Sequence, residues 1–179
     1  MTLSLQTTQA TGESLIASFF QQSAGQWRSE RRYYTLPDGD VKEMVSLITV
    51  RFLAAGCSDL LHLAQLHPEG DRLNLTCGAE VTWNSTDATT GRKKSKGTTL
   101  FGVQGDILYR DRGFATPHPV TAQFYFNHPT TLCLRTEYND SVFEEELKLI
   151  GQQYRTRQTI ISRAGEQQMI GQYLERRIG

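Results

Sequence analysis

The chain shows two hydrophobic patterns, one with a helical period and one that alternates residue by residue. Over Glu13–Ala24 the apolar side chains recur on one face of a helix, and Gly25 is a suitable residue to end it. A second, shorter helix is predicted over Ser58–His67, where Pro68 stops it. The apolar stripe of the first helix consists of Leu15, Ile16, Phe19 and Phe20.

Alternating apolar and polar residues elsewhere predict about ten short β-strands joined by turns of hairpin length. A closed barrel leaves no exposed sheet edges, whereas a sandwich would have to protect them. We therefore predict a mainly β fold, an antiparallel up-and-down barrel with an N-terminal helix and one short helix between early strands. The predicted strands span residues 26–36, 44–53, 77–85, 98–103, 106–111, 120–126, 131–138, 142–150, 154–163 and 167–177.

The first predicted strand carries a tryptophan that defines its inward face. If Trp27 points inward, a period of two residues directs every second side chain of this strand inward as well. We expect Trp27 to pack at the closed end of the barrel under an arginine of the last strand, Arg176 or Arg177. The other inward positions are Ser29, Arg31, Tyr33 and Thr35.

Composition narrows the class of protein. The 179 residues fit one domain, which we place at residues 13–179 after a flexible tail at residues 1–12. Lys and Arg number 19, as do Asp and Glu, so the net charge indicates neither a nucleic-acid nor a membrane partner. Three cysteines without C-x-x-C spacing predict reduced thiols and no metal site. No apolar run approaches the ~20 residues of a membrane span, and the start lacks a secretory pattern.

An ordered series of motifs resembles one known family over residues 18–178. The first is Phe19-Phe20-x-x-Ser23-x-Gly25-x-Trp27-x-Ser29-x-Arg31, followed by Cys77-Gly78-Ala79-x-Val81-x-Trp83 and Gly97-Thr98-Thr99-Leu100. Next come Gly105-Asp106-Ile107-Leu108-Tyr109-Arg110-Asp111-Arg112-Gly113-Phe114, Thr136-Glu137-Tyr138, Glu144-Glu145 and Arg155-x-Arg157. The chain thus resembles the S-type (CpcS/CpeS) phycobiliprotein lyases, or chromophore lyases, which are similar to lipocalins and fatty-acid-binding proteins in fold.

The resemblance implies an enzyme that binds a linear tetrapyrrole, a bilin of the phycocyanobilin type, as substrate rather than as a permanent cofactor. Such a lyase attaches the bilin through a thioether to a cysteine of an apo-phycobiliprotein subunit of the phycocyanin or allophycocyanin type. The implied setting is the cytoplasm of a cyanobacterium or the stroma of a plastid.

Three arginines are candidate anchors for the bilin propionates, because a guanidinium binds a carboxylate in a planar, two-pronged geometry. Arg31 shares the inward face of Trp27, and its alternative role is a structural ion pair with a barrel acid such as Glu145. Arg155 and Arg157 lie on one face of their strand, but alternation does not decide whether that face is inward.

Aromatic residues are the second group of candidate chromophore contacts. The family usually has a histidine just after the first-strand arginine, where this chain has Tyr33 and Tyr34. Trp83 would provide a flat apolar wall for a conjugated ring, or else pack in the core.

Glu137 and Glu145 are the candidate catalytic acids. Glu145 shares its face with Phe143 and Leu147, so we expect it to face the interior. A buried carboxylate there could pair with protonated pyrrole nitrogens and make the bilin more electrophilic, or could form a buried ion pair with an arginine. The sequence supports both interpretations.

Two other functions stay open because the chain departs from the family pattern. A second tryptophan commonly follows the position of Trp83, but residues 85–90 contain none, and Lys148 replaces a common aromatic residue. One alternative is a carrier of a bilin or another apolar acid that performs no transfer. The other is a non-catalytic partner subunit of a heteromeric lyase, which presents the acceptor protein to an active paralogue. The oligomers that we consider are a homodimer and a heteromer with a paralogous lyase subunit.

Overall fold

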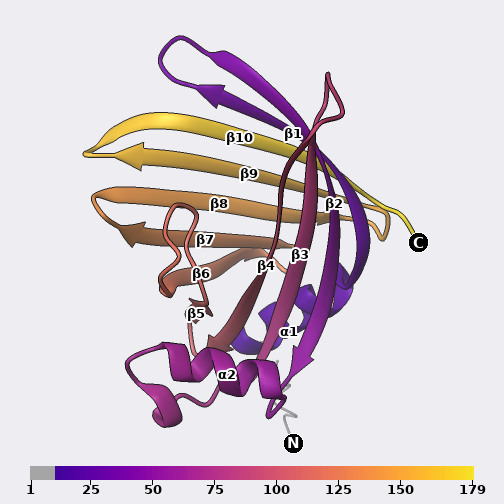
Figure 1. Ribbon diagram of the computed structural model, residues 1–179. Coiled ribbons are helices and arrows are strands. Elements are labelled where there is room, and N and C mark those ends of the chain that lie inside the picture. Colours follow the sequence, from indigo (N-terminus) through magenta and orange to yellow (C-terminus); the bar gives the residue numbers. More distant parts are fainter. Residues whose placement is uncertain (1–10) are drawn as a thin grey trace, which may run out of the picture.

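The structure, a computed structural model, describes residues 11–179 and contains one closed antiparallel barrel of ten strands (Figure 1). Each strand pairs with its neighbours in sequence, and the first strand closes the barrel by pairing with the last. This confirms the predicted fold. The strands are β1 (Gly25–Thr35), β2 (Asp40–Ala54), β3 (Cys77–Asp87), β4 (Lys93–Gln104), β5 (Ile107–Arg110), β6 (Val120–His128), β7 (Thr131–Tyr138), β8 (Ser141–Ile150), β9 (Tyr154–Arg163) and β10 (Glu166–Arg177).

Helix α1 (Gly12–Ser23) packs at one end of the barrel and places its apolar stripe, including Phe19 and Phe20, in the core. Its first turn is capped by the Thr11 hydroxyl, which accepts a hydrogen bond from the backbone N–H of Ser14 at 3.2 Å. Of the tail predicted for residues 1–12, residues 1–10 lie outside the part that the structure describes.

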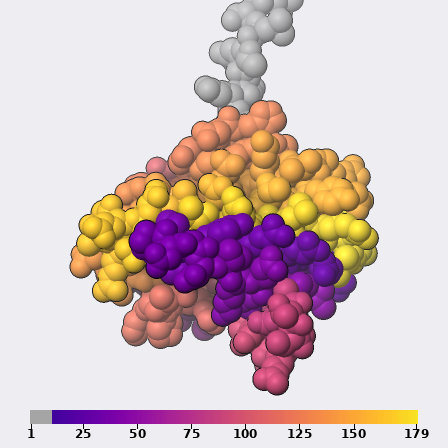
Figure 2. Space-filling model, turned by 90° about the horizontal axis from the view of Figure 1, so that it is seen from above, coloured from indigo at the N-terminus to yellow at the C-terminus, as the bar shows by residue number. Residues whose placement is uncertain are grey.

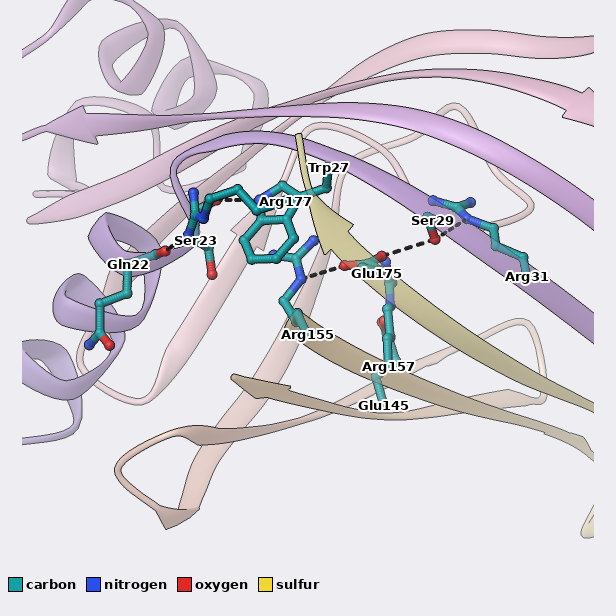
Figure 3. Close-up of polar contacts among 10 residues, drawn as sticks. All are labelled: Gln22, Ser23, Trp27, Ser29, Arg31, Glu145, Arg155, Arg157, Glu175 and Arg177. Carbon is teal, nitrogen blue, oxygen red and sulfur yellow. Dashed lines mark hydrogen bonds and ion pairs between the residues drawn. The ribbon is translucent and has the colours of Figure 1, made fainter. Parts of the chain in front are cut away.

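Trp27 forms the floor of the barrel beside α1, as the Gly-x-Trp pattern predicted. Its indole N–H donates to the Ser23 carbonyl at 2.8 Å, and the Arg177 guanidinium lies 4.2 Å from the centre of a Trp27 ring. Arg177 also donates to the carbonyl of Gln22 in the last turn of α1 (Figure 3) and to the carbonyl of Ala24, which follows the helix. Gly25 has φ +128°, and a Cβ there would lie 2.6 Å from Arg177 Nη1, so this position requires glycine.

Helix α2 (Ser58–Leu66) packs outside the barrel and forms a second hydrophobic cluster with residues of β2, β4 and β5, and the short 3-10 helix η1 (Gly70–Arg72) follows it. Two paired glycines, Gly78 on β3 and Gly102 on β4, let Leu60 and Leu63 of α2 approach the sheet closely. Within residues 11–179, no helix is long and apolar enough to cross a membrane.

The largest departure from the predicted boundaries is the β3–β4 hairpin. The sequence favours a polar loop at residues 86–96, but β3 reaches Asp87 and β4 begins at Lys93. Backbone pairing needs no apolar side chains, and the Asp87 carboxylate accepts the N–H groups of Thr89 and Thr90, each at 2.9 Å. The hairpin projects from the body of the protein (Figure 2).

The two glycines under α2 provide a test of how closely this helix packs against β3 and β4. A Cβ at Gly78 would lie 2.0 Å from the Phe101 carbonyl oxygen, whereas at Gly102 it would meet only the ends of leucine side chains. We expect Gly78→Ala to lower the free energy of unfolding by ~1–3 kcal/mol or more, and Gly102→Ala to lower it less. Urea unfolding of both variants measures this order, and equal losses would contradict it.

Candidate functional site

The barrel interior contains a cavity of about 210 Å³. The cavity is smaller than the ~300–1,000 Å³ typical of sites that enclose a drug-sized ligand, so a large ligand must displace side chains or protrude. A recess of about 160 Å³ adjoins it and shares Arg31, Arg157 and Phe114 with it. The apolar wall of the cavity includes Ile48, Val50, Val81, Trp83, Phe101, Leu108, Leu132, Leu134 and Leu147.

The end of the barrel opposite α1, which we call the mouth, is partly covered by the loop between β5 and β6. Phe114 of this loop stacks on Phe143 with ring centroids 4.8 Å apart, and the Tyr138 hydroxyl accepts the backbone N–H of Ala115 at 2.9 Å. Arg112 lies 5.4 Å from the ring of Trp83. This loop thus brings an aromatic ring and a cation to the cavity wall.

Trp83 lines the cavity, and the residue opposite it on β4 is a glycine that leaves room for its ring. Trp83 pairs with Gly97, and a Cβ at Gly97 would lie 2.6 Å from the indole. The glycine therefore leaves the space in which the ring lies against the cavity. The motif that ends at Trp83 and the motif that begins at Gly97 are therefore linked by this contact between β3 and β4.

A buried ion pair joins three strands at the seam where the barrel closes. The Glu175 side chain of β10 is fully buried and accepts a hydrogen bond from Arg155 Nε of β9 at 2.5 Å (Figure 3). Its other oxygen accepts from the Ser29 hydroxyl of β1 at 3.2 Å, and Ser29 in turn accepts from Arg31 Nε at 3.1 Å. Arg155 also lies 5.0 Å from the ring of Trp27. Arg155 thus has a structural role in the unliganded barrel.

Burial and charge act in opposite directions on Glu175. Burial raises the pKa of a carboxyl group, but the guanidinium groups of Arg155, Arg157 and Arg31 together outweigh this effect and hold the Glu175 pKa below its usual value. Glu175 is therefore ionised at neutral pH.

A second buried acid, Glu145 of β8, lies between two arginines. Arg157 of β9 donates to Glu145 Oε2, and Arg110 Nη1 of β5 lies 3.9 Å from Oε1. Oε1 has no hydrogen-bond partner, and neither do the Nε atoms of Arg110 and Arg157. One carboxylate therefore serves two cations, and three polar atoms around it lack partners.

Arg157 and Arg110 respond differently to burial. Burial lowers the pKa of Arg157, but the Glu145 carboxylate together with Tyr173 and Glu175 raises it by more, and the net shift is upward. Burial also lowers the pKa of Arg110, and Glu145 offsets only part of that shift. The pairing of Glu145 is therefore mainly with Arg157.

Arg31 lies one inward position nearer the mouth than Ser29 and has no carboxylate within 4.0 Å among the described residues. Its guanidinium carbon lies 5.0 Å from the ring of Tyr173, over which Arg157 also lies at 5.6 Å. The predicted alternative of an ion pair between Arg31 and Glu145 is thus not formed. Tyr33 packs edge-on against Tyr173 with ring centroids 5.6 Å apart.

The structure brings most of the predicted site residues together and leaves two apart. Arg155 and Arg157 lie on the inward face of β9. The alternation of residues along this strand had left their direction open. Glu137 and Tyr34 lie on the outer face instead, and Glu137 is exposed and pairs with Arg135 at 2.5 Å. The predicted site residues that lie at or beside the cavity are Arg31, Tyr33, Trp83, Glu145, Arg155 and Arg157.

Sequence reasoning missed two charged residues of the interior, Glu175 and Arg110. On β10 the apolar Leu174 is half exposed while the adjacent Glu175 is fully buried, so alternation alone favours the wrong face. The pairing of Arg177 with Trp27 is the signal that identifies the inward face. Arg110 lies within the motif at residues 105–114, but the residues of that motif do not show whether its side chain faces inward or outward.

A larger hollow of about 630 Å³ lies along the outer surface of β1, β2 and β10. Its charged side chains pair with one another, as in the Arg28–Glu30 pair and the Arg32–Glu43 pair at 2.9 Å. Its lining contains four arginines and three glutamates, and two of these arginines, Arg31 and Arg157, also line the cavity. The cavity lining, in contrast, has five arginines and one glutamate. These arginines are Arg31, Arg110, Arg112, Arg155 and Arg157, and the glutamate is Glu145.

The closed antiparallel barrel with a helix at one end and a charged, partly apolar interior places the protein in the lipocalin-like class. Residues 15–178 match the family described as CpeS-like protein. The chain therefore belongs to the CpcS/CpeS family of chromophore lyases, as its motifs predicted.

Similar proteins support this assignment. "Putative phycocyanobilin lyase CpcS 2" from Nostoc sp. is 68% identical over 166 residues, which cover 93% of this chain and 92% of that protein. "Putative chromophore lyase CpcV" from Picosynechococcus sp. is 48% identical over 170 residues, with coverages of 94% and 84%. The solved structure of the S-type phycobiliprotein lyase CpeS from Guillardia theta covers 92% of this chain, and 93% of that chain is covered. It aligns with a TM-score of 0.74 at 22% identity, which shows the shared fold.

The Arg155–Glu175 pair generates a stability test. Glu175→Gln leaves a buried guanidinium without its anion, and we expect it to lower the free energy of unfolding at pH 7 by ~3–5 kcal/mol. The control Glu137→Gln removes an exposed pair, and we expect a loss of about 1 kcal/mol or less. Chemical unfolding of both variants measures the difference, and equal losses would contradict the structural role of Glu175.

The same pair predicts how this loss depends on pH. Because the folded-state pKa of Glu175 is depressed, its contribution is complete above the unfolded pKa of ~4.3 and disappears as the pH falls through the lower folded value. The stability difference between wild type and Glu175→Gln should therefore narrow at acidic pH.

Proposed function

We propose that the protein binds a bilin of the phycocyanobilin type and attaches it to a cysteine of an apo-phycobiliprotein subunit. The observation that carries this proposal is the excess of arginine over glutamate in an otherwise apolar cavity. Buried cations are unfavourable without anions, so the cavity suits an extended apolar molecule that carries carboxylates. A linear tetrapyrrole with two propionates has this chemistry, and the similar Nostoc protein carries the name of a phycocyanobilin lyase.

Arg31 and Arg157 are the proposed anchors at the mouth. Both flank Tyr173, both line the cavity and the adjoining recess, and Arg31 lacks a carboxylate partner among residues 11–179. A propionate there could accept hydrogen bonds in the two-pronged geometry that guanidinium groups favour. Tyr33 and Trp83 would contact the rings of the bilin, whereas Arg155 would support the site through Glu175.

Glu145 is the proposed acid of the site. Glu145 lines the cavity, and one of its oxygens is bound by Arg157 while Oε1 has no hydrogen-bond partner. That oxygen can accept a pyrrole N–H and stabilise the protonated tetrapyrrole, which makes the bilin more electrophilic. Glu137 is left out of this proposal because it lies on the outer face.

The acceptor protein would supply the nucleophile. Its thiolate adds to the ethylidene carbon of ring A, the carbon–sulfur bond forms, and the displaced π electrons take up a proton on the tetrapyrrole. Cys77 of the barrel is buried, and burial raises its pKa to about 11, so it is a poor competitor. Burial also raises the pKa of Cys133. The barrel would contribute orientation and shielding of the reactive carbon from stray thiols.

Co-expression of the chain with a bilin source and each apo-phycobiliprotein subunit tests the proposal. We expect bilin fluorescence that stays with the acceptor after denaturation. Bilin held only non-covalently by this chain would indicate a carrier. If transfer appears only when a paralogous lyase is added, the chain is a partner subunit.

Two adjacent arginines of β1 separate ligand binding from general effects of charge. Arg31 points inward, whereas Arg32 lies on the outer surface and pairs with Glu43. We expect Arg31→Ala to weaken bilin binding ~10–100-fold through the loss of a charge-assisted hydrogen bond, and Arg32→Ala to bind normally. Titration followed by bilin absorbance measures both affinities, and normal binding by Arg31→Ala would exclude the anchor role.

A further inference from the structure

We propose that Arg110, buried at the end of β5, is a second carboxylate anchor, which binds one propionate while Arg31 binds the other. This inference rests on the proposed bilin-binding function and assigns a residue to which neither the motifs nor the comparisons give a role. It identifies the ligand as a dianion whose two carboxylates bind at separate positions.

Arg110 is the buried cation with the weakest pairing. Its residue is only 6% exposed, and its Nε lacks a hydrogen-bond partner. The nearest carboxylate oxygen, Glu145 Oε1, lies 3.9 Å from Nη1, beyond hydrogen-bonding distance, and the other oxygen of Glu145 is bound by Arg157. Arg110 therefore has a buried charge whose hydrogen-bonding capacity is largely unused.

The surroundings of Arg110 hold its guanidinium at the cavity rather than at the surface. Its carbon Cζ lies 4.9 Å from the ring of Phe101 and 4.6 Å from that of Phe114. The backbone beneath it is also fixed, because the Arg110 carbonyl lies 3.1 Å from Nε2 of the buried His67. Two aromatic faces and a fixed backbone thus present a cation to the cavity, with stacking surfaces beside it for a conjugated ring.

Charge balance favours two separate anchors. Arg155 pairs with Glu175, and Arg157 pairs with Glu145. Among the buried or half-buried arginines of the cavity, Arg31 and Arg110 have no hydrogen-bonded carboxylate within the described residues. Two such cations match two propionates. Arg110 lies on β5 and Arg31 on β1, and β2, β3 and β4 separate these strands in the barrel, so the two cations come from different parts of the cavity wall.

Esters of one bilin test this assignment without relying on transfer activity. Biliverdin is a diacid, and its dimethyl ester has the same rings without the charges. We expect wild-type protein to bind biliverdin more tightly than the dimethyl ester. Arg110→Met should weaken biliverdin binding ~10–100-fold and leave binding of the ester nearly unchanged. Arg110→Met combined with Arg31→Ala should prefer the acid over the ester less than either single variant does, with Arg157 as the anchor that remains.

Stability provides a readout that separates an anchor from a structural residue. Methionine has a similar length and retains contacts with aromatic rings, while the poorly paired buried charge is removed. We expect the unliganded Arg110→Met variant to unfold at or above the wild-type temperature, and Arg110→Lys provides a second variant that keeps the charge. If both variants fail to fold, Arg110 is a structural residue and the assignment is wrong.

The outcomes also separate this inference from the proposed function. The anchor role is excluded if Arg110→Met binds biliverdin with wild-type affinity. It is also excluded if its affinities for biliverdin and for the dimethyl ester fall by the same factor. In both cases the proposal that the protein binds a bilin stands. If wild-type protein binds neither biliverdin nor its ester, both the proposed function and this inference fail.

Discussion

The ion pair between the Glu175 carboxylate and Arg155 is the interaction on which the closed barrel most depends. It joins β9 and β10 through Arg155 and reaches β1 through Ser29, so it lies at the seam where the last strand meets the first. A fully buried charge is tolerated only with a close partner, and Arg155 meets that need while also lying over Trp27. The floor of the barrel and its closure are therefore stabilised by one group of side chains.

The buried ion pairs also determine which arginines remain available to bind a ligand. Because Arg155 is satisfied by Glu175 and Arg157 by Glu145, the positive charge that lacks a partner resides on Arg31 near the mouth and Arg110 in the interior. Apolar walls between them exclude water, which strengthens any charge-assisted hydrogen bond formed there. The same network thus stabilises the empty barrel and prepares it for an anionic, largely apolar guest. The small volume of the cavity indicates that such a guest must displace the Phe114 loop or extend beyond it.

Much of the architecture could be read from local patterns. The predicted strands at residues 131–138 and 154–163 match β7 and β9 because tight turns bound them on both sides. The packing of Trp27 under an arginine of the last strand followed from the Gly-x-Trp pattern, and the structure identifies Arg177, rather than Arg176, as that arginine. The β3–β4 hairpin was predicted too short, since its outer part is held by backbone and Asp87 hydrogen bonds that leave no hydrophobic signal.

By itself, the sequence determined the barrel, its order of strands, its family, and the inward positions of Arg31 and Glu145. Alternation divides a strand into two faces, and wherever an apolar or aromatic residue marks one face it identifies the inside. Only the tertiary structure decided that Arg155, Arg157, Arg110 and Glu175 face inward and that Glu137 faces out. The physical reason is that buried charges are selected by partners on other strands, and those partners meet only when the register is set and the barrel closes.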